Sequence, residues 1–120
     1  MSDYDIRNDV KYAPLEVIDA GALGRAAVPW FNQTLCRVNE SVIRLGVIEG
    51  EFHWHKHDCE DEFFYVVEGR LLIDIEDEEG VDLAPGQAFV VPAGTVHRTR
   101  APERTTLLMA ATAGVEPTGD

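Results

Sequence analysis

Most of the structural information in this sequence lies in HKHDCEDEFFYVVEG, residues 55–69, and in GQAFVVPAGTVH, residues 86–97. Both stretches combine short apolar runs with turn residues, which is typical of the strands of an all-β sandwich or barrel. Together they contribute three imidazoles and one carboxylate, from His55, His57, Glu62 and His97. Such ligands suit a divalent transition metal, so we predict a metal site built from these four residues.

The spacing of these residues favours one shared site. His55 and His57 are two positions apart, so on a strand their side chains point to the same side. Glu62 lies five positions beyond His57, which on a straight strand is the opposite side. Residues 58–61 must therefore form a turn or bulge that restores the inward direction. The fourth ligand, His97, has to come from a distant strand.

In these residues the chain resembles the cupin superfamily, whose members carry two gapped motifs. The first motif, H-x-H followed by E and then G, is matched by His55, His57, Glu62 and Gly69. The second motif, G followed by P-x-G and H, is matched by Gly86, Pro92, Gly94 and His97. Two positions depart from the family pattern: Gly50 lies one residue closer to the histidines than usual, and Ala101 stands where the family has Asn.

The resemblance spans roughly residues 50–97 and is strongest to small single-domain cupins of the phosphomannose-isomerase-like, cupin 2 type. It implies an all-β fold, the cupin double-stranded β-helix or jelly-roll barrel, with the metal inside its mouth. It also implies one divalent transition metal per chain, with Mn, Fe, Ni and Zn as the candidates.

Two functions follow from this resemblance. The first is a small metalloenzyme of the dioxygenase, isomerase or decarboxylase type, acting on an oxygen-rich or carbonyl metabolite; the fold does not choose among these reactions. The alternative is a non-catalytic module that binds a metal or a small ligand, because no catalytic acid or base stands out in the sequence. We favour the enzyme.

Two further residues near the motifs are assigned ordinary roles. His53 also forms an H-x-H with His55, but using that pair would put Glu62 and Gly69 out of register by two positions. We therefore expect His53 to line the cavity rather than to bind the metal. Cys59 lies among acidic residues, which disfavour a reactive thiolate, so we expect an ordinary loop cysteine.

The rest of the chain predicts one domain in three parts. Residues 1–14 form a polar N-terminal arm, residues 15–112 the barrel, and residues 113–120 an irregular tail. Residues 15–27 could hold a short strand and a turn of helix, and Gly21 and Gly24 argue against a long helix there. Strands are predicted near 33–39, 41–49, 52–57, 62–68, 70–76, 87–91, 96–100 and 105–112.

Charge and composition limit the partners and the location. Ten Lys and Arg against 22 Asp and Glu give a formal net charge of -12, which disfavours binding to nucleic acid or to anionic membranes. The polar N-terminus does not resemble a signal peptide, and the two cysteines are too few for a disulfide framework. We therefore expect a cytoplasmic protein with a small-molecule ligand or substrate.

A homodimer is also expected. If strand alternation continues through residues 58–61, Trp54, Phe63 and Tyr65 lie on the side opposite the metal ligands. Large apolar side chains on an outer barrel face favour a covered surface, and a second copy of the chain is the expected cover.

Overall fold

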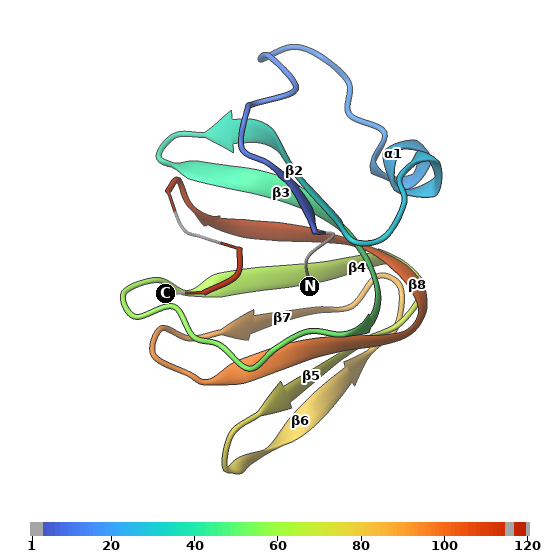
Figure 1. The fold of residues 1–120 in the computed structure, drawn as a ribbon. Coiled ribbons are helices and arrows are strands. Elements are labelled where there is room, and N and C mark those ends of the chain that lie inside the picture. Colours follow the sequence, from blue (N-terminus) through green and yellow to red (C-terminus); the bar gives the residue numbers. More distant parts are fainter. Residues whose placement is uncertain (1–3, 115–116, 120) are drawn as a thin grey trace.

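The structure is a computed structural model that describes residues 4–114 and 117–119. Within these residues, eight strands belong to one sheet that curls around a core, and one short helix lies against it (Figure 1). The strands are β1 (Asp5–Arg7), β2 (Phe31–Val38), β3 (Ser41–Glu51), β4 (Glu62–Glu68), β5 (Leu71–Ile75), β6 (Glu78–Leu83), β7 (Ala88–Val91) and β8 (His97–Thr112). The helix is α1 (Ala20–Ala26). The predicted all-β class is confirmed.

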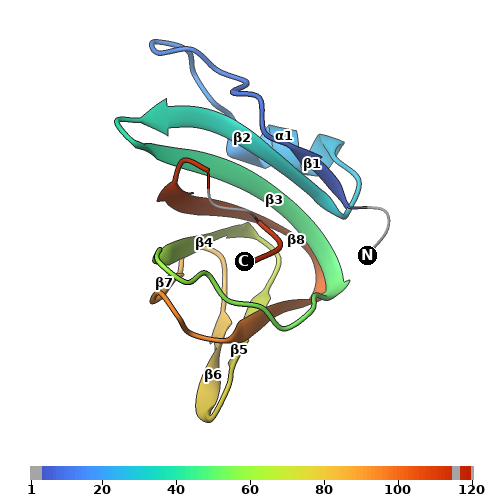
Figure 2. The same cartoon turned by 60° about the vertical axis from the view of Figure 1, so that its left-hand side comes forward.

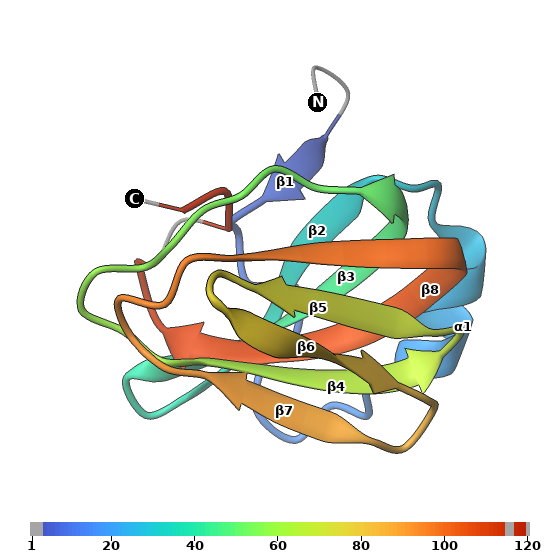
Figure 3. The same ribbon diagram turned by 90° about the horizontal axis from the view of Figure 1, so that it is seen from below.

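The long strand β8 organises the sheet. The hydrogen-bonded order is β1-β2-β3-β8-β4-β7, while β5 pairs with the first part of β8 and carries β6 on its other edge. Seen from below, β8 runs alongside β5 and β4, and β7 lies beyond β4 (Figure 3). Because β8 touches three other strands, residues at its start are held from several sides.

Two apolar clusters stabilise the fold, one inside the curled sheet and one outside it. The inner cluster includes the fully buried Val66, Leu71 and Ile73, and the alternation along β5 places Leu72 and Asp74 away from it. The outer cluster joins Leu35 and Leu45, on the opposite face of β2 and β3, to the helix α1.

The arm and the helix are tied to the sheet by polar contacts. Residues 5–7 of the arm pair in parallel with β2 as β1, which Figure 2 shows beside it. The helix begins after Asp19, whose carboxylate accepts a hydrogen bond from the backbone N–H of Ala22. Arg104 of β8 donates to the carbonyl oxygens of Gly24 and Ala27 at the other end of the helix. The division into arm, barrel and tail stays a prediction.

Three sequence-based strand assignments differ from the structure. Residues 52–57 do not form a strand, because residues 52–54 lie opposite only two residues of β8, 98 and 99, and β8 offers no partner beyond His55. No strand is predicted from the sequence between residues 76 and 87, whereas the structure has β6 there. The strands predicted at 96–100 and 105–112 are one continuous strand, β8.

Candidate metal centre

The four predicted ligands come together at one end of the curled sheet. Glu62 is the first residue of β4 and His97 the first residue of β8. His55 is held against His97 by two backbone hydrogen bonds of 2.9 Å, one in each direction. One ligand atom from each of His55, His57, Glu62 and His97 lies within 4.8 Å of all the others. The predicted turn at 58–61 therefore does return Glu62 to the side of the histidines.

The cluster is largely removed from solvent. His97 is fully buried and His57 and Glu62 nearly so, while His55 is half-buried. The Oε1 atom of Glu62 lies 3.3 Å from Nε2 of His57 and 3.5 Å from Nε2 of His97. The imidazoles and the carboxylate therefore converge on a common space.

Backbone carbonyls fix which nitrogen of two imidazoles faces this space. Nδ1 of His97 lies 2.9 Å from the carbonyl oxygen of Thr95, and Nδ1 of His55 lies 3.0 Å from that of His53. A carbonyl oxygen only accepts, so Nδ1 carries the proton in both rings. Nε2 is then the unprotonated nitrogen of each neutral ring, as metal ligation requires.

Burial and charge alter the acidity of the cluster. Removal of His55 from water lowers the pKa of its imidazole from 6.5 to about 4. Burial alone would raise the pKa of Glu62, but His57 and His97 outweigh that effect and lower it from 4.5 to about 2. Near neutral pH, His55 is therefore neutral and Glu62 is ionised, which are the forms that bind a cation.

Acid is expected to lower the stability of the metal-free protein, because folding keeps the imidazole of His55 neutral. Unfolded chains protonate this imidazole near pH 6.5, whereas folded chains do so only near pH 4. The unfolded state binds more protons in this window, so the free energy of unfolding falls as pH drops through it. The test compares the Tm of wild type with that of His55→Gln, because the titration of surface groups is the same in both and cancels in the difference. This difference should become less favourable to wild type as the pH falls from 7 to 4. A difference that stays level would contradict the burial of His55.

The residues at this centre fit a divalent cation. Among the described residues, Oε1 of Glu62 and Nε2 of His97 are buried and make no hydrogen bond. Each buried polar atom left without a hydrogen bond costs about 1–3 kcal/mol, and folded proteins rarely keep two such atoms together. A cation coordinated by both atoms removes that cost.

The other residues considered from the sequence lie outside the cluster. Nε2 of His53 lies 2.8 Å from the carbonyl oxygen of Thr118, on the C-terminal segment, and its ring lies 5.4 Å from that of His55, but His53 belongs neither to the cluster nor to the walls of the cavity beside it. Cys59 is exposed. Trp54, Phe63 and Tyr65 are 47%, 39% and 36% exposed, consistent with the outward direction expected for them.

Sequence reasoning missed a small cavity beside the cluster. Its volume is about 30 Å³, and its walls include Tyr4 and Asn32 as well as His55 and Glu62. Tyr4 belongs to the segment predicted to be a polar arm, and no periodicity in the sequence marked it. The one available signal was polar residues on the inward face of strands that are otherwise apolar, namely Asn32, Thr34 and Arg44.

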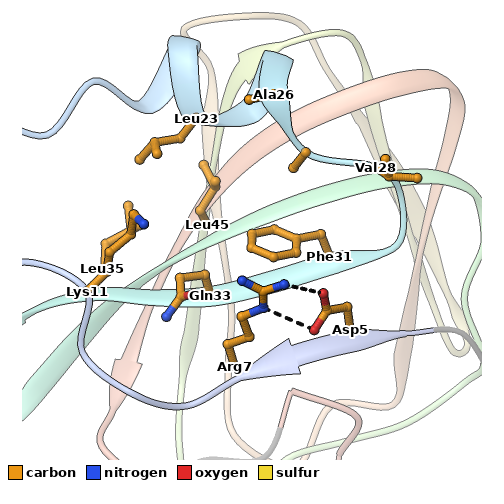
Figure 4. A pocket seen from close by; sticks show the side chains of 11 residues that line it. Asp5, Arg7, Lys11, Leu23, Ala26, Val28, Phe31, Gln33, Leu35 and Leu45 are labelled. Carbon is orange, nitrogen blue, oxygen red and sulfur yellow. Dashed lines mark hydrogen bonds and ion pairs between the residues drawn. The ribbon is translucent and has the colours of Figure 1, made fainter.

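A larger hollow on the outer face of the sheet is separate from the cluster. It measures about 360 Å³ and lies between α1 and the strands β1 and β2 (Figure 4). Leu23, Leu35 and Leu45 form its apolar wall, and the ion pair of Arg7 with Asp5 lies at its edge (Figure 4). It shares no lining residue with the candidate metal centre.

Comparison with known proteins identifies the family of this chain. The family model described as "Cupin domain" matches residues 42–111, more than half of the 120 residues. The uncharacterized protein YdbB of Bacillus subtilis (strain 168) is 46% identical over 74 residues, or 62% of this chain. This chain spans just under two thirds of that relative, 66% of its length.

Solved structures of other proteins share the fold of this chain. A cupin-2 domain containing protein from Shewanella frigidimarina NCIMB 400 has a TM-score of 0.72 and 30% identity, covering 78% of this chain and 92% of its own. BH2720 from Bacillus halodurans shares the fold, with a TM-score of 0.75 and 20% identity over 93% of this chain and 92% of its own. The chain belongs to the cupin family and is a small single-domain cupin of the cupin 2 type.

Proposed function

We propose that this cupin is a small metal-dependent enzyme. It holds one divalent transition ion, either Mn, Fe, Ni or Zn, on His55, His57, Glu62 and His97. Its substrate is a small oxygen-rich or carbonyl metabolite, and its reaction is of the dioxygenase, isomerase or decarboxylase type.

Two buried polar atoms give this proposal its main support. Oε1 of Glu62 and Nε2 of His97 make no hydrogen bond among the described residues, although they lie 3.5 Å apart in the interior. Without a cation, both groups would lose their hydrogen bonds to water on folding and gain no hydrogen bond in exchange. The carbonyl oxygens that hold Nδ1 of His55 and His97 add a second, independent support, because metal-binding histidines are oriented in this way.

When bound, the ion supplies Lewis-acid or redox chemistry at the mouth of the barrel. The chain's own residues set the surroundings. Phe64, Leu107 and Met109 line the cavity beside the cluster and keep bulk water away from it. A low-dielectric wall of this kind strengthens every charge interaction in the site.

A non-catalytic metal- or small-ligand-binding module is the second candidate, and the size of the cavity favours it. About 30 Å³ accommodates little more than a water molecule, whereas pockets for metabolites measure roughly 300–1,000 Å³. A larger substrate can enter only if a wall residue such as Pro117, on the C-terminal segment, moves aside. The enzyme and the module therefore differ in what happens after the metal has bound.

Metal analysis followed by a turnover screen tests the proposal. Untagged protein purified without chelators is expected to hold about one Mn, Fe, Ni or Zn per chain, or to take up one on reconstitution. Metal-loaded protein that turns over a carbonyl or polyol substrate, with loss of turnover in a folded His55→Ala variant, supports the enzyme. Stoichiometric metal without turnover supports the module, and failure to take up any metal contradicts both.

The proposal includes a cytoplasmic homodimer. Phe63 and Tyr65 of β4 and Val90 of β7 are exposed on neighbouring strands and form one apolar outer face. A second copy would cover this face, and sedimentation equilibrium should then give twice the chain mass of 13.3 kDa. A mass of one chain at micromolar concentration would contradict the dimer. Among the described residues no helix is long and apolar enough to cross a membrane.

A further inference from the structure

The side chain of Tyr4 is fixed inside the mouth of the barrel. Its ring packs edge-on against Trp30 and Phe52, with centroid distances of 5.5 Å and 5.6 Å. The next residue, Asp5, donates a backbone hydrogen bond of 3.0 Å to the carbonyl oxygen of Trp30 and begins β1. Phe52 also contacts the ring of His55 edge-on, at 5.2 Å. The phenol is therefore packed into the same aromatic group that adjoins a candidate ligand.

A chain of hydrogen bonds determines the role of the Tyr4 hydroxyl. Nε of Arg44 donates to Oδ1 of Asn32 at 2.6 Å. Since a guanidinium has no acceptor, the oxygen of the Asn32 amide must face Arg44, and its NH₂ group faces Tyr4. Nδ2 of Asn32 accordingly donates to the Tyr4 oxygen at 3.3 Å. The hydroxyl accepts this bond and keeps its own proton for another acceptor.

The acceptor for that proton has to lie in the cavity. Tyr4 and Asn32 line the 30 Å³ cavity together with His55 and Glu62. Among residues 4–114 and 117–119, no hydrogen bond has the Tyr4 hydroxyl as its donor. The remaining walls are mostly apolar, from residues such as Phe64, Leu107 and Met109. A small ligand at the metal centre would supply the missing oxygen or nitrogen atom.

The surroundings favour a protonated phenol and partly offset the cost of its anion. Burial and the charge of Glu62 raise the pKa of Tyr4, so the hydroxyl keeps its proton at neutral pH, while the bond from Asn32 and the charge of Arg44 act in the opposite direction. Arg44 is itself buried and held in place by Thr34 at 2.8 Å and Asn8 at 2.9 Å. A positive charge fixed behind the phenol stabilises negative charge that develops on its oxygen.

We propose that Tyr4 donates a hydrogen bond, and during turnover a proton, to an oxygen atom of the ligand bound beside the candidate metal centre. In the transfer, the phenolic O–H bond breaks and a new O–H bond forms on the ligand. The electron pair stays on the Tyr4 oxygen, where Asn32 and Arg44 stabilise it, and solvent later returns the proton. This inference rests on the proposed function, and it narrows the substrate to a small molecule in which an oxygen gains negative charge, such as an enolate or alkoxide.

Azide binding to the Co(II)-loaded protein tests the proposal without requiring a known substrate. The visible absorption of Co(II) reports azide binding, and metal analysis of each sample gives its occupancy. Tyr4→Phe is expected to weaken azide binding by about 10-fold or more, because a hydrogen bond to a charged group is lost. Tyr12→Phe makes the same chemical change on the outer cluster and should leave azide affinity unchanged.

A second variant separates the hydrogen bond from packing. In Asn32→Asp, the new carboxylate has almost the shape of the amide, can pair with Arg44, and accepts the proton of the Tyr4 hydroxyl. That hydroxyl then turns away from the cavity, so azide affinity should fall as in Tyr4→Phe while metal occupancy is kept. Circular dichroism confirms that each variant is folded.

The outcomes distinguish this inference from the proposed function. Full Co(II) occupancy with equal azide affinity in wild type and Tyr4→Phe would overturn the role of Tyr4 and leave the metal centre standing. Equal losses in Tyr4→Phe and Tyr12→Phe would also overturn it. A wild-type protein that takes up no Co(II) would overturn the proposed function, and the inference with it.

Discussion

His57→Ala is expected to lose stoichiometric metal binding, whereas His53→Ala is expected to retain it. The two histidines lie on either side of His55 in the run HWHKH, so sequence spacing alone barely separates them. In the structure, His57 is buried with its Nε2 atom 3.3 Å from Oε1 of Glu62, while His53 is exposed and contacts Thr118. Removing a ligand should reduce affinity by more than the 10- to 100-fold typical of residues that only support ligands.

The measurement is metal content per chain together with a competition titration against a chelator of known affinity. Both variants remove one imidazole from the same short segment, so a nonspecific effect of losing a histidine would appear in both. Retention of metal by His57→Ala with loss in His53→Ala would shift the centre to the alternative H-x-H pair. Equal retention in both variants would mean that the ion binds somewhere other than this cluster.

Gly69→Ala is expected to destabilise the protein much more than Gly86→Ala, although both positions belong to the family motifs. The two glycines have similar left-handed backbone conformations, with φ of 95° and 86°. Forcing Ala into such a conformation costs roughly 1–2 kcal/mol. At Gly86 nothing lies within 4 Å of an added Cβ, so this backbone cost is the whole expected effect.

At Gly69 the added methyl group would also collide with its neighbours. An ideal Cβ would lie 2.7 Å from the backbone oxygen of Arg104 and would overlap the hydroxyl of Thr105. That hydroxyl bonds the backbone N–H and carbonyl of Arg70, so it cannot move without breaking contacts between β5 and β8. The total loss should reach about 3 kcal/mol or more, in the range of severe backbone and packing changes.

Urea unfolding of both variants, with the same metal content as the wild type, provides the comparison. The expected result is a lower midpoint at an unchanged slope for each variant, with the larger shift for Gly69→Ala. Similar shifts in the two variants would mean that β8 relaxes away from position 69 at little cost. The close approach of β8 to this turn would then not be the reason for glycine there.

The four clustered residues could be predicted from the sequence because each belongs to a motif whose spacing is recognisable within a short stretch of the chain. A turn at 58–61 was predicted from strand parity alone, and the structure brings Glu62 to the histidines as that turn requires. The same local information fails for β6, whose first residues are acidic and exposed and whose packing against the core is limited to Val81 and Leu83. Pairing along β5, rather than burial, makes residues 78–80 part of this strand.

Pro102 lies in the gap between the strands predicted at 96–100 and 105–112. A proline lacks the N–H that a central strand must donate, so its presence inside the continuous strand β8 needs an explanation. In the structure, the pairing of β3 with β8 shifts register between Ile48 and Gly50, so that residues 102–104 of β8 lie opposite the single residue Glu49. Pro102 therefore lies in a bulge of β8 where no residue of β3 pairs with it, and this bulge depends on residues about fifty positions apart.

The barrel and the N-terminal arm contribute different residues to the surroundings of the candidate metal centre. The family match begins at residue 42 and includes all four clustered residues, but it leaves out Tyr4 and Asn32. Tyr4 directly precedes β1, a strand of three residues whose side chains do not belong to the inner apolar cluster. Over evolution, substitutions in such a segment can change the group that faces a bound ligand while the ion-binding residues stay the same. Relatives grouped by the shared domain alone can then differ in the reaction they perform, and their N-terminal segments are the place to look for that divergence.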